Sequence, residues 1–359
     1  MRNSWVLGEL PLSFDIETRE ILKKLPLAHA ALAELKGIGE SIPDQNILIN
    51  TLAIQEAKDS SEVENIITTH DELFAAEVNK EKSSSPASKE VLNYVSAMKR
   101  GFGLISEQGF ISSRTILQIQ SELEKNSAGF RKVPGTVLRS NQGGKVIYEP
   151  PQNGAKIISL MSNLEKYIND FDRDDFDVIT KMAIIHFQFE SIHPFYDGNG
   201  RTGRILNILY LILQKQQSLP ILYLSKYVIQ NKSEYYKYLQ IIRDENNWEP
   251  WIQYIINAVI ETANDTTKLI KNIKSLMNEM KVEMRSRYKF YSHDLINNIF
   301  RHPYTKVEFL VEELSVSKNT AMSYLNKLVQ DGFLHKEKKG YSNFYVNTKL
   351  YKLLENTKS

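Results

Sequence analysis

The segment HPFYDGNGRTGR, residues 193–204, constrains the fold more than any other feature of the sequence. It lies between two strongly apolar segments, 176–192 and 201–214, whose residues are typical of buried helices. Because a proline disfavours helical backbone in the residue before it, Pro194 is expected to end the first helix at His193. The sequence therefore predicts two buried helices joined by a short loop.

The composition of that loop predicts an anion site. Gly198 and Gly200 let the backbone turn tightly and present its N–H groups at the start of a helix. The helix dipole favours a negative ligand there, and Arg201 and Arg204, three residues apart, lie on one helical face. Phosphate is the ligand that such an arrangement fits best.

Two further side chains give the loop a chemistry. Asp197 is a hard oxygen ligand of the kind that holds magnesium bridging two phosphates. The imidazole of His193 is suited to accept a proton near neutral pH. A base, a metal ligand and a phosphate site thus occur within one loop.

The segment resembles the signature of the Fic family, HxFx(D/E)GNGRxxR, at every specified position. The preceding HFQFESI is also similar to the helix that enters the Fic loop, and the resemblance covers residues 10 to 260. It implies an adenylyltransferase, or AMPylator, which transfers AMP from ATP to serine, threonine or tyrosine hydroxyls of other proteins or of the chain itself and releases diphosphate.

The resemblance also implies a role for each loop residue. His193 would deprotonate the attacking hydroxyl, and Asp197 would bind Mg²⁺ on the α- and β-phosphates. The remaining residues would hold the nucleotide: Gly198, Asn199, Gly200, Arg201, Thr202, Gly203 and Arg204.

Two other segments resemble parts of a Fic nucleotide and target site. NKSEYYKYL is similar to the segment that holds the base, which makes Asn231, Tyr235 and Tyr236 candidates for contacts with adenine or ribose. A glycine turn between β-branched runs predicts a hairpin within residues 135–151. It resembles the flap that aligns the target by strand addition, with Lys145, Val146, Ile147, Tyr148 and Glu149 as flap residues.

An inhibitory motif is the third resemblance. SSEVEN, residues 60–65, fits (S/T)xxxE(G/N) with Ser60, Glu64 and Asn65 at the defined places. The resemblance implies that Glu64 pairs with Arg204 and takes the place of the γ-phosphate, so that ATP binds in an unproductive pose. A solvated helical glutamate is the simpler alternative.

Residues 292–347 have the pattern of a winged helix-turn-helix. Ser317 is expected to cap a third helix whose apolar face contains Ala321, Leu325 and Leu328, and a hairpin should turn near Gly340. Basic and polar side chains on the helix and wing predict DNA as a partner, with a protein-interaction or dimer module as the alternative: Lys318, Asn319, Ser323, Lys327, Lys336, Lys338 and Lys339.

Length and composition agree with more than one packed unit. The 359 residues are 42% hydrophobic and carry a net charge of only +2, so no overall field favours nucleic acid or membrane. There is no cysteine, which excludes disulfides, thiol nucleophiles and cysteine-bound zinc. The longest apolar run, 205–213, is too short for a bilayer span, and a cytoplasmic location is expected.

The polar, serine-rich residues 80–90 are expected to form a loop, with helix resuming near Val91. His186 is interpreted as a structural residue, because no carboxylate cluster at metal spacing accompanies it and His193.

The sequence thus predicts a mainly α fold, with a Fic-type helical core, a β-hairpin flap and a C-terminal winged helix. The expected divisions are an N-terminal helical region that carries the inhibitory helix (1–95), the catalytic core (96–265), and a linker helix with the winged helix (266–359). Two other functions stay open: transfer of a different phosphate-containing group, and a DNA-binding regulator whose core senses nucleotide. A homodimer also stays open.

Overall fold

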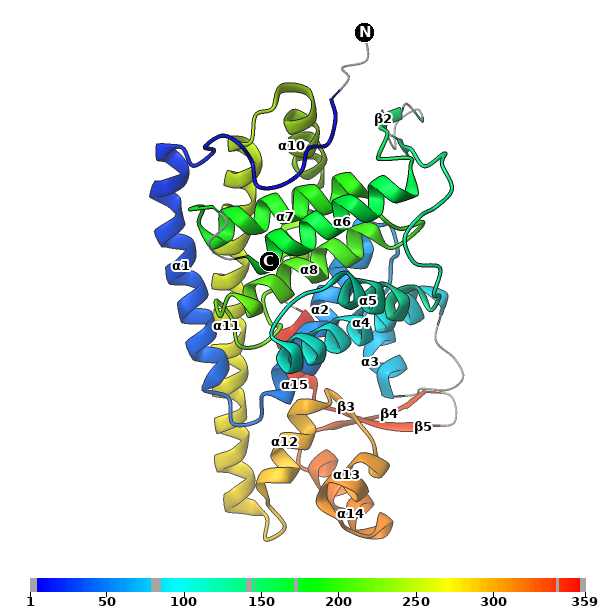
Figure 1. Ribbon diagram of the computed structural model, residues 1–359. Helices are drawn as coiled ribbons and strands as arrows, with labels where there is room; N and C mark the ends of the chain where they lie inside the picture. Colours follow the sequence, from blue (N-terminus) through cyan, green and yellow to red (C-terminus); the bar gives the residue numbers. More distant parts are fainter. Residues whose placement is uncertain are drawn as a thin grey trace.

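The computed structural model describes residues 5–78, 85–139, 144, 146–170, 174–339 and 342–355. The fold is mainly α, as predicted, with two small antiparallel sheets in the described parts (Figure 1). None of the described helices combines the length and apolarity that a bilayer span requires.

The centre of the molecule is an antiparallel pair of helices, α7 (Val178–Ile192) and α8 (Asn199–Leu213). Every side chain of α7 from residue 179 to 192 is buried, which is the property of a helix covered on all sides. The neighbouring helices that cover the pair are α6 (Gly154–Asn169), α4 (Pro86–Gln108) and α5 (Ser113–Glu124).

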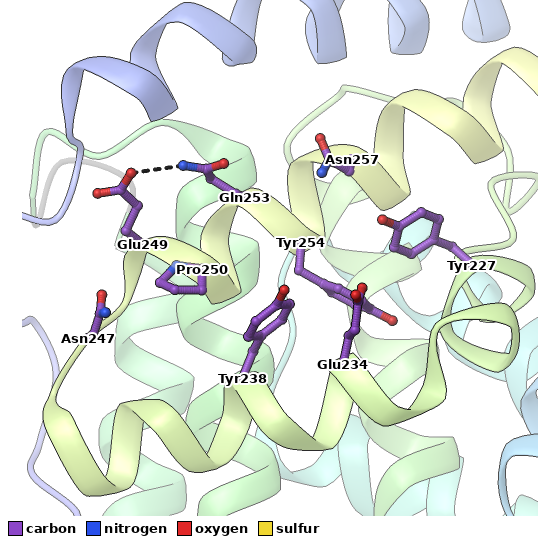
Figure 2. A pocket seen from close by; sticks show the side chains of 9 residues that line it. All are labelled: Tyr227, Glu234, Tyr238, Asn247, Glu249, Pro250, Gln253, Tyr254 and Asn257. Carbon is purple, nitrogen blue, oxygen red and sulfur yellow. Dashed lines mark hydrogen bonds between the residues drawn. The ribbon is translucent and has the colours of Figure 1, made fainter.

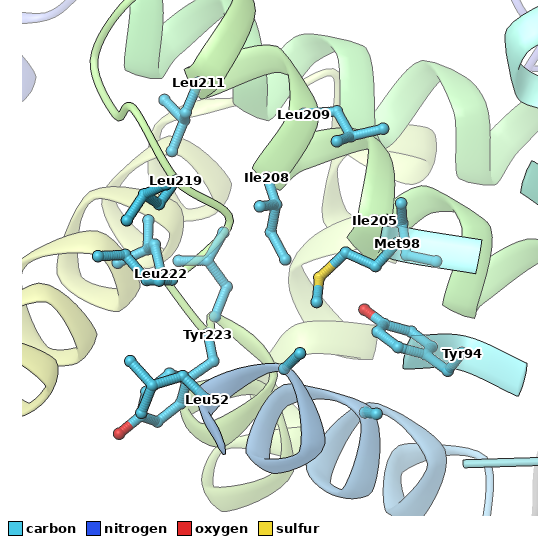
Figure 3. Close-up of a cluster of buried hydrophobic side chains, with 14 of the residues drawn as sticks. Leu52, Tyr94, Met98, Ile205, Ile208, Leu209, Leu211, Leu219, Leu222 and Tyr223 are labelled. Carbon is cyan, nitrogen blue, oxygen red and sulfur yellow. The ribbon is translucent and has the colours of Figure 1, made fainter. Parts of the chain in front are cut away.

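Helix α2 (Asn46–Val63) packs into the same core as α8, the helix that follows His193. Figure 3 shows Leu52 of α2, Tyr94 and Met98 of α4, and Ile208 of α8 around one apolar cluster. All four side chains are at most 2% exposed. The helix that ends at the predicted inhibitory motif is therefore part of the core and is not a surface addition.

Two long helices lie side by side, and the longer of them continues to the C-terminal elements (Figure 1). Helix α1 (Arg19–Glu40) packs along α11 (Glu249–Arg287), whose 39 residues span about 58 Å at 1.5 Å per residue. Between α8 and α11 the chain forms α9 (Ser225–Gln230) and α10 (Lys232–Glu245). Helix α11 thus passes from α7 to the C-terminal elements.

The C-terminal elements form a small unit of helices and a sheet of order β3-β5-β4. The predicted cap and apolar face of α14 are confirmed: Ser317 Oγ accepts a hydrogen bond from the N–H of Thr320, and the three apolar side chains are fully buried. The winged-helix assignment itself stays a prediction. The side chain of Lys339 and the whole of Gly340 lie outside the part of the chain that the structure describes. The elements are α12 (His293–Arg301), β3 (Tyr304–Thr305), α13 (Val307–Leu314), α14 (Lys318–Gln330), β4 (His335–Lys339), β5 (Ser342–Val346) and α15 (Thr348–Glu355).

This C-terminal unit contacts the region of α2 directly. Arg301 of α12 forms an ion pair with Asp44, which lies just before α2. The side chain of Gln55 donates to the carbonyl of Leu354 in α15. The two contacts tie the helix with the predicted inhibitory motif to the last part of the chain.

The start of α4 corrects one expectation. Residues 80–90 were expected to form a loop, with helix from Val91, but α4 begins at Pro86. The reason is local, because Ser85 Oγ caps the helix by accepting from the N–H of Ser88, and proline is favoured in a first helical turn. The preceding helix is α3 (His70–Val78).

The predicted hairpin is present as two short strands. β1 (Leu138–Arg139) pairs antiparallel with β2 (Val146–Tyr148), and Leu138 lies opposite Tyr148. Lys145 and the turn residues Asn141, Gln142 and Gly143 lie outside the described residues. The expected domain boundaries after residues 95 and 265 fall within the continuous helices α4 and α11, so that division stays a prediction.

Candidate active site

His193 ends helix α7 in a left-handed backbone conformation, with φ of 47°. This conformation is uncommon for a residue other than glycine and persists only where neighbouring groups hold it. Arg131 provides that support, because its Nε donates to the carbonyl of His193 at 2.7 Å and its backbone N–H donates to the carbonyl of Pro194 at 2.8 Å. The helix end predicted from Pro194 is confirmed.

Asn199 closes the loop onto itself. Its Oδ1 accepts from the N–H of Phe195 and its Nδ2 donates to the same residue's carbonyl, both at 2.8 Å. Gly198 has a φ of 78°, and a Cβ at that position would collide with Oε1 of Glu124. The conformation therefore favours glycine at Gly198, and any larger residue would also displace the Glu124 side chain.

The His193 imidazole is in a state that suits a general base. Burial lowers its pKa to about 4, and the positive charges of Arg131 and Arg243 act in the same direction. Its Nδ1 has no hydrogen-bond partner among the described residues. The ring is therefore neutral at pH 7 and has a lone pair available to take a proton.

Arg204 is almost fully buried and fully engaged by the end of α2. Its Nε donates to Ser60 Oγ, and its Nη2 donates to the carbonyl of Ser60 and to Oε1 of Glu64, each at 2.8 Å. The side chain is 2% exposed. The guanidinium therefore has its charge neutralised by a carboxylate from 140 residues away in the sequence.

Glu64 is the C-terminal cap of α2 and lies against Gly200, in the segment of residues 193–204. Burial alone would raise its pKa, but the charge and hydrogen bond of Arg204, with help from Arg201 and Lys232, hold the pKa below its usual value. A Cβ at Gly200 would collide with Oε1 of Glu64. The carboxylate is thus ionised and in contact with the helix N-terminus where an anion is expected.

The rest of the predicted inhibitory motif is also near the loop. Ser60 is fully buried and supplies two acceptors to Arg204. Asn65 has a φ of 64°, and its Oδ1 accepts from Lys232 Nζ at 3.2 Å. The turn after Glu64 is thereby joined to the start of α10.

Arg201 is held by two other carboxylates. Its Nη2 donates to Glu124 of α5 at 2.9 Å and its Nη1 to Glu90 of α4 at 3.2 Å. Burial raises the pKa of Glu124, and the charge of Asp197 adds to the rise, although Arg201 opposes it. Arg201 and Arg204 are therefore each bound to a carboxylate, with which a phosphate would have to compete for the guanidinium.

Asp197 is exposed, and its Oδ1 accepts from the N–H of Gly198 at 2.7 Å. The described residues contain no cluster of three or more acidic or imidazole groups suited to a metal. Mg²⁺ is commonly held by one or two carboxylates together with phosphates and waters, so a single aspartate beside a phosphate loop fits this ion.

Two hollows meet at Glu64, which lines both together with His193 and Gly200. One hollow, of 340 Å³, follows the loop and contains Glu90, Asp197 and Arg201 among its lining residues. The other, of 640 Å³, extends between the flap and α10. The carboxylate therefore stands between the hollow along the loop and the larger one.

The predicted base-binding residues differ in their placement. Tyr235 and Tyr236 line the larger hollow, but Tyr235 is 2% exposed and its hydroxyl bonds to His186 Nε2 at 2.7 Å. Asn231 is not among the residues that line this hollow, and its Nδ2 donates to the carbonyl of Tyr227. His186, interpreted from the sequence as structural, is fully enclosed, with Nδ1 at 3.0 Å from Asn207 Nδ2.

The flap closes the other side of the larger hollow. The hydroxyl of Tyr148 donates to the carbonyl of Ser191, and the Arg243 guanidinium lies 4.0 Å from the centre of the Tyr148 ring. Ile147 and Glu149 are exposed, and Ile147, although 43% exposed, also lines the larger hollow beside Tyr148.

Some site residues were missed by the sequence reasoning. Glu190 lines the larger hollow, burial raises its pKa to about 7, and its Oε1 has no hydrogen-bond partner among the described residues. The available signal was that Glu190 is the only carboxylate in α7. Arg243 and Arg131 gave none, because each reaches the site from a segment with no motif. Thr202 and Gly203 occupy the first turn of α8, where Gly203 packs closely on Glu190.

Family models match three successive parts of the chain. They are described as Fic/DOC family N-terminal (residues 22–103), Fic/DOC family (residues 110–211) and Protein adenylyltransferase SoFic-like, C-terminal domain (residues 276–350). Together they match more than half of the chain, and the central model includes the loop of residues 193–204.

Curated relatives and solved structures agree with these matches. Relatives named Protein adenylyltransferase Fic, from Aedes aegypti and Drosophila mojavensis, are 30% and 29% identical over 179 residues, which is 49% of this chain but 33% of each relative. The match thus spans about a third of their length.

Two crystal structures are similar in fold. A Fic family protein from Desulfovibrio desulfuricans has a TM-score of 0.60 at 19% identity and covers 94% of this chain and 98% of its own. A Fic domain containing signaling protein from Bacteroides thetaiotaomicron has a TM-score of 0.53 at 15% identity, with coverages of 68% and 97%.

Proposed function

The chain belongs to the Fic/Doc family, and on that premise we propose that it is a protein adenylyltransferase that moves AMP from ATP to a hydroxyl side chain. One observation carries the proposal. A neutral, partly buried histidine, His193, lines the same hollow as the helix N-terminus at Gly198–Arg201. A base beside a phosphate site is what nucleotidyl transfer to a hydroxyl requires.

The reaction follows from those positions. The target hydroxyl oxygen forms a bond to the α-phosphorus, and the bond from that phosphorus to the bridging oxygen of the β-phosphate breaks. His193 takes the proton of the hydroxyl, and diphosphate leaves. The N–H groups of the α8 N-terminus and the two arginines, Arg201 and Arg204, stabilise the phosphate charge, so that positioning and electrostatics supply most of the catalysis.

Magnesium fits the loop through Asp197, whose carboxylate is exposed beside the phosphate hollow. The ion would neutralise charge on the α- and β-phosphates when bound. Asn199 contributes by fixing the loop, since both of its amide atoms bond to Phe195.

The basal state is proposed to be inhibited. Glu64 occupies Arg204 and lies between the two hollows, so the γ-phosphate and the carboxylate compete for one guanidinium. While Glu64 holds Arg204, a triphosphate cannot extend along the loop with its α-phosphate in line with the attacking hydroxyl.

The target is proposed to bind along the flap. Strand β2 has β1 as its neighbour in the sheet, so its other edge is available for strand addition by an extended segment. Serine, threonine and tyrosine all stay as acceptors, on another protein or on the chain itself. Tyr235 and Tyr236 are proposed to border the base and ribose.

A second candidate function concerns the C-terminal unit. The side chains of Lys318, Asn319, Ser323 and Lys327 are exposed on α14, which favours a contact with DNA phosphates. Lys318 lies within ion-pair distance of Glu308, and Lys327 lies within ion-pair distance of Asp331, so the positive potential at this surface of α14 is weakened. Binding to duplex DNA that falls steeply with salt, in the absence of AMP transfer, would favour this regulator over the enzyme.

The test uses ATP labelled at either the α- or the γ-phosphate. Wild type, Glu64→Gly and His193→Ala are incubated with Mg²⁺ and a cell lysate, and labelled protein is separated on a gel. Label from the α position alone, absent in His193→Ala, is expected. Label from the γ position would mean phosphorylation, and no label with any variant would overturn the enzymatic proposal.

A further inference from the structure

A hollow of 560 Å³ lies beside the flap, and we call it the N-terminal hollow because residues 5–7 form one of its walls. The flap, α6 and α10 form the other walls, and none of residues 193–204 lines it. The two hollows beside the flap adjoin, because four residues line both this hollow and the larger hollow of the active site: Ile147, Tyr148, Gln240 and Arg243.

Contacts within the protein fix the walls of the N-terminal hollow. Asn163 of α6 bonds to both backbone groups of Leu10, accepting from its N–H at 2.8 Å and donating to its carbonyl at 2.9 Å. The Trp5 ring packs edge-on against Tyr148 of the flap, with 6.0 Å between the ring centres. The hollow is therefore formed before a ligand binds, which reduces the entropy lost on binding.

Arg243 lies at the junction of the two hollows as a buried cation. It is 6% exposed, and none of the ion pairs among the described residues includes it. Its Nη2 donates to Ser191 Oγ at 3.1 Å, and its Nε has no hydrogen-bond partner in the part of the chain that the structure describes. The Tyr148 ring, 4.0 Å away, stabilises the charge but offers no acceptor in the plane of the guanidinium. Because a guanidinium has five N–H donors, most of those of Arg243 have no protein acceptor.

The other three buried arginines of the described residues have the partners that Arg243 lacks. Arg201 and Arg204 each bind a carboxylate. Arg131 donates to three backbone carbonyls. Arg243 is thus distinguished from them by its open donors and its unbalanced charge.

A hollow of 320 Å³ between α10 and α11 shows the same difference (Figure 2). Its Gln253 accepts a hydrogen bond from Lys24 and donates one to Glu249, and its Tyr254 is 2% exposed. Those side chains are already held by other parts of the protein, whereas Arg243 has donors for a ligand.

A buried cation without a balancing carboxylate favours an anionic ligand. Burial of an unpaired charge is costly, so an anion that binds Arg243 removes a cost that a surface arginine does not have. The other charged residues of the N-terminal hollow are exposed and screened by solvent: Lys156, which pairs with Glu9, and the carboxylates Glu149 and Asp244. Arg243 therefore determines the sign of the ligand charge.

We propose that the N-terminal hollow binds an acidic side chain of the target protein, with its carboxylate on the guanidinium of Arg243. A planar guanidinium matches a carboxylate through two parallel hydrogen bonds. The inference rests on the proposed function and deepens it, because it names the class of target: proteins with aspartate or glutamate close to the hydroxyl that receives AMP. Arg243 is then a specificity-determining residue.

The flap connects the acidic side chain to the reacting hydroxyl. Strand β2 borders both hollows, so an extended segment added to its edge opposite β1 passes from the hollow of His193 to the N-terminal hollow. Val6 and Ile147 are 78% and 43% exposed and offer apolar surface to the aliphatic part of the side chain. A nucleotide phosphate fits less well, because the start of α8 does not border the N-terminal hollow.

The first test is binding of peptides to the full chain, measured by fluorescence anisotropy. Short labelled peptides of threonine and valine contain one serine, with a glutamate at successive positions on either side of it, and a matched set has glutamine instead. Glutamate is expected to bind about tenfold more tightly than glutamine, and only at alternate positions, because the side chains of a strand alternate between its faces. Equal binding of the two sets at every position would overturn the proposal, as would no binding at millimolar peptide concentration.

Variants then place the preference at Arg243. In Arg243→Gln the two peptides are expected to bind equally, and the comparison within one variant cancels any general loss of order in the flap. Arg243→Lys keeps the charge without the planar fork, so the preference should fall to about threefold, and this variant carries the test if Arg243→Gln does not fold. An unchanged preference would contradict the proposal.

Lys166→Gln is the matched control, because Lys166 is exposed on α6 and lines neither hollow. It should keep the full preference for glutamate. An equal loss of preference in Lys166→Gln and Arg243→Gln would attribute the effect to the overall charge of the chain, and the proposal would fail.

Two further measurements separate this inference from the proposed function: calorimetric binding of ATP to Arg243→Gln, and transfer of α-labelled AMP to the same peptides by Glu64→Gly. Weaker binding of ATP, with the glutamate preference intact, would assign Arg243 to the nucleotide and overturn the inference. A glutamate preference in binding without any AMP transfer would refute the enzymatic proposal and leave the acidic-segment site in place. Transfer at equal rates to both peptide sets would do the reverse.

Discussion

Replacement of Glu64 by glycine is the most direct test of the inhibited state. The substitution removes the carboxylate from Arg204 but leaves that guanidinium its two bonds to Ser60. A hydrogen bond between charged groups contributes about 1.5–3 kcal/mol. The Glu64 side chain is 35% exposed, so solvent screening moves the expected value to the lower end, about 1.5 kcal/mol.

This free energy sets the expected change. In the variant, ATP no longer has to displace Glu64. Because 1.4 kcal/mol corresponds to a factor of ten in an equilibrium constant, the apparent affinity for ATP should rise about tenfold. The rate of AMP transfer should rise at least as much, because the productive pose becomes available. Glu64→Gln keeps the shape and removes the charge, and it should give an intermediate rate.

The assay measures incorporation of α-labelled AMP and, separately, ATP affinity by calorimetry. Glu62→Gln is the matched control, because Glu62 lies on the last turn of α2, pairs with Lys58 and does not contact Arg204. Equal transfer rates in wild type and Glu64→Gly would refute the reasoning. So would an equal rise in Glu62→Gln, which would attribute the effect to loss of negative charge at the helix end.

Three further predictions follow from the charges of the site. In Glu64→Gly, kcat/KM should be independent of pH from about pH 6 to 8, because the pKa of His193 is lowered to about 4. An inflection of the pH profile near 6.5, the ordinary pKa of histidine, would contradict this. Glu124→Gln should lower the KM for ATP about threefold with little change in kcat, because one carboxylate no longer holds Arg201. An unchanged KM in steady-state assays would exclude competition between Glu124 and the nucleotide for Arg201. Glu56 has its pKa raised to about 7 by burial, so its contribution to stability is complete below 4.5 and is lost as pH rises through 7. In the wild type the free energy of unfolding should therefore fall between pH 5 and pH 8, and Glu56→Gln should make this fall smaller by up to about 3 kcal/mol, as measured by urea denaturation. Part of the fall should remain in the variant, because the pKa of Glu190 is raised as far. A fall of the same size in wild type and variant would contradict the buried-carboxyl account.

Local features of the site could be predicted from the sequence because their causes are local. Pro194 ends α7 through a clash with the preceding residue, and Ser317 caps α14 through a hydrogen bond three residues away. The start of α4 was missed although its cause is equally local. A serine-rich segment was interpreted as a loop, whereas Ser85 is the cap of the next helix.

The pairing across the site had a different origin. Glu64 and Arg204 are 140 residues apart, and their contact was expected only from the resemblance to a family, since no spacing predicts it. Arg131 and Glu124 reach the loop from other segments with no motif of their own. Their positions depend on how whole helices pack, which residue patterns do not determine.

Helix α2 shows why such packing escapes a reading of the sequence. Polar side chains are buried on several of its faces, including Gln55, Glu56 and Ser60, so it lacks the apolar stripe of a surface helix. Each polar group meets a different part of the molecule: Gln55 the carbonyl of Leu354, Glu56 the N–H of Ser225, and Ser60 the guanidinium of Arg204. The position of the Glu64 carboxylate is therefore determined jointly by the catalytic core, by α9 and by the last helix of the chain, because all three hold the helix that ends at it.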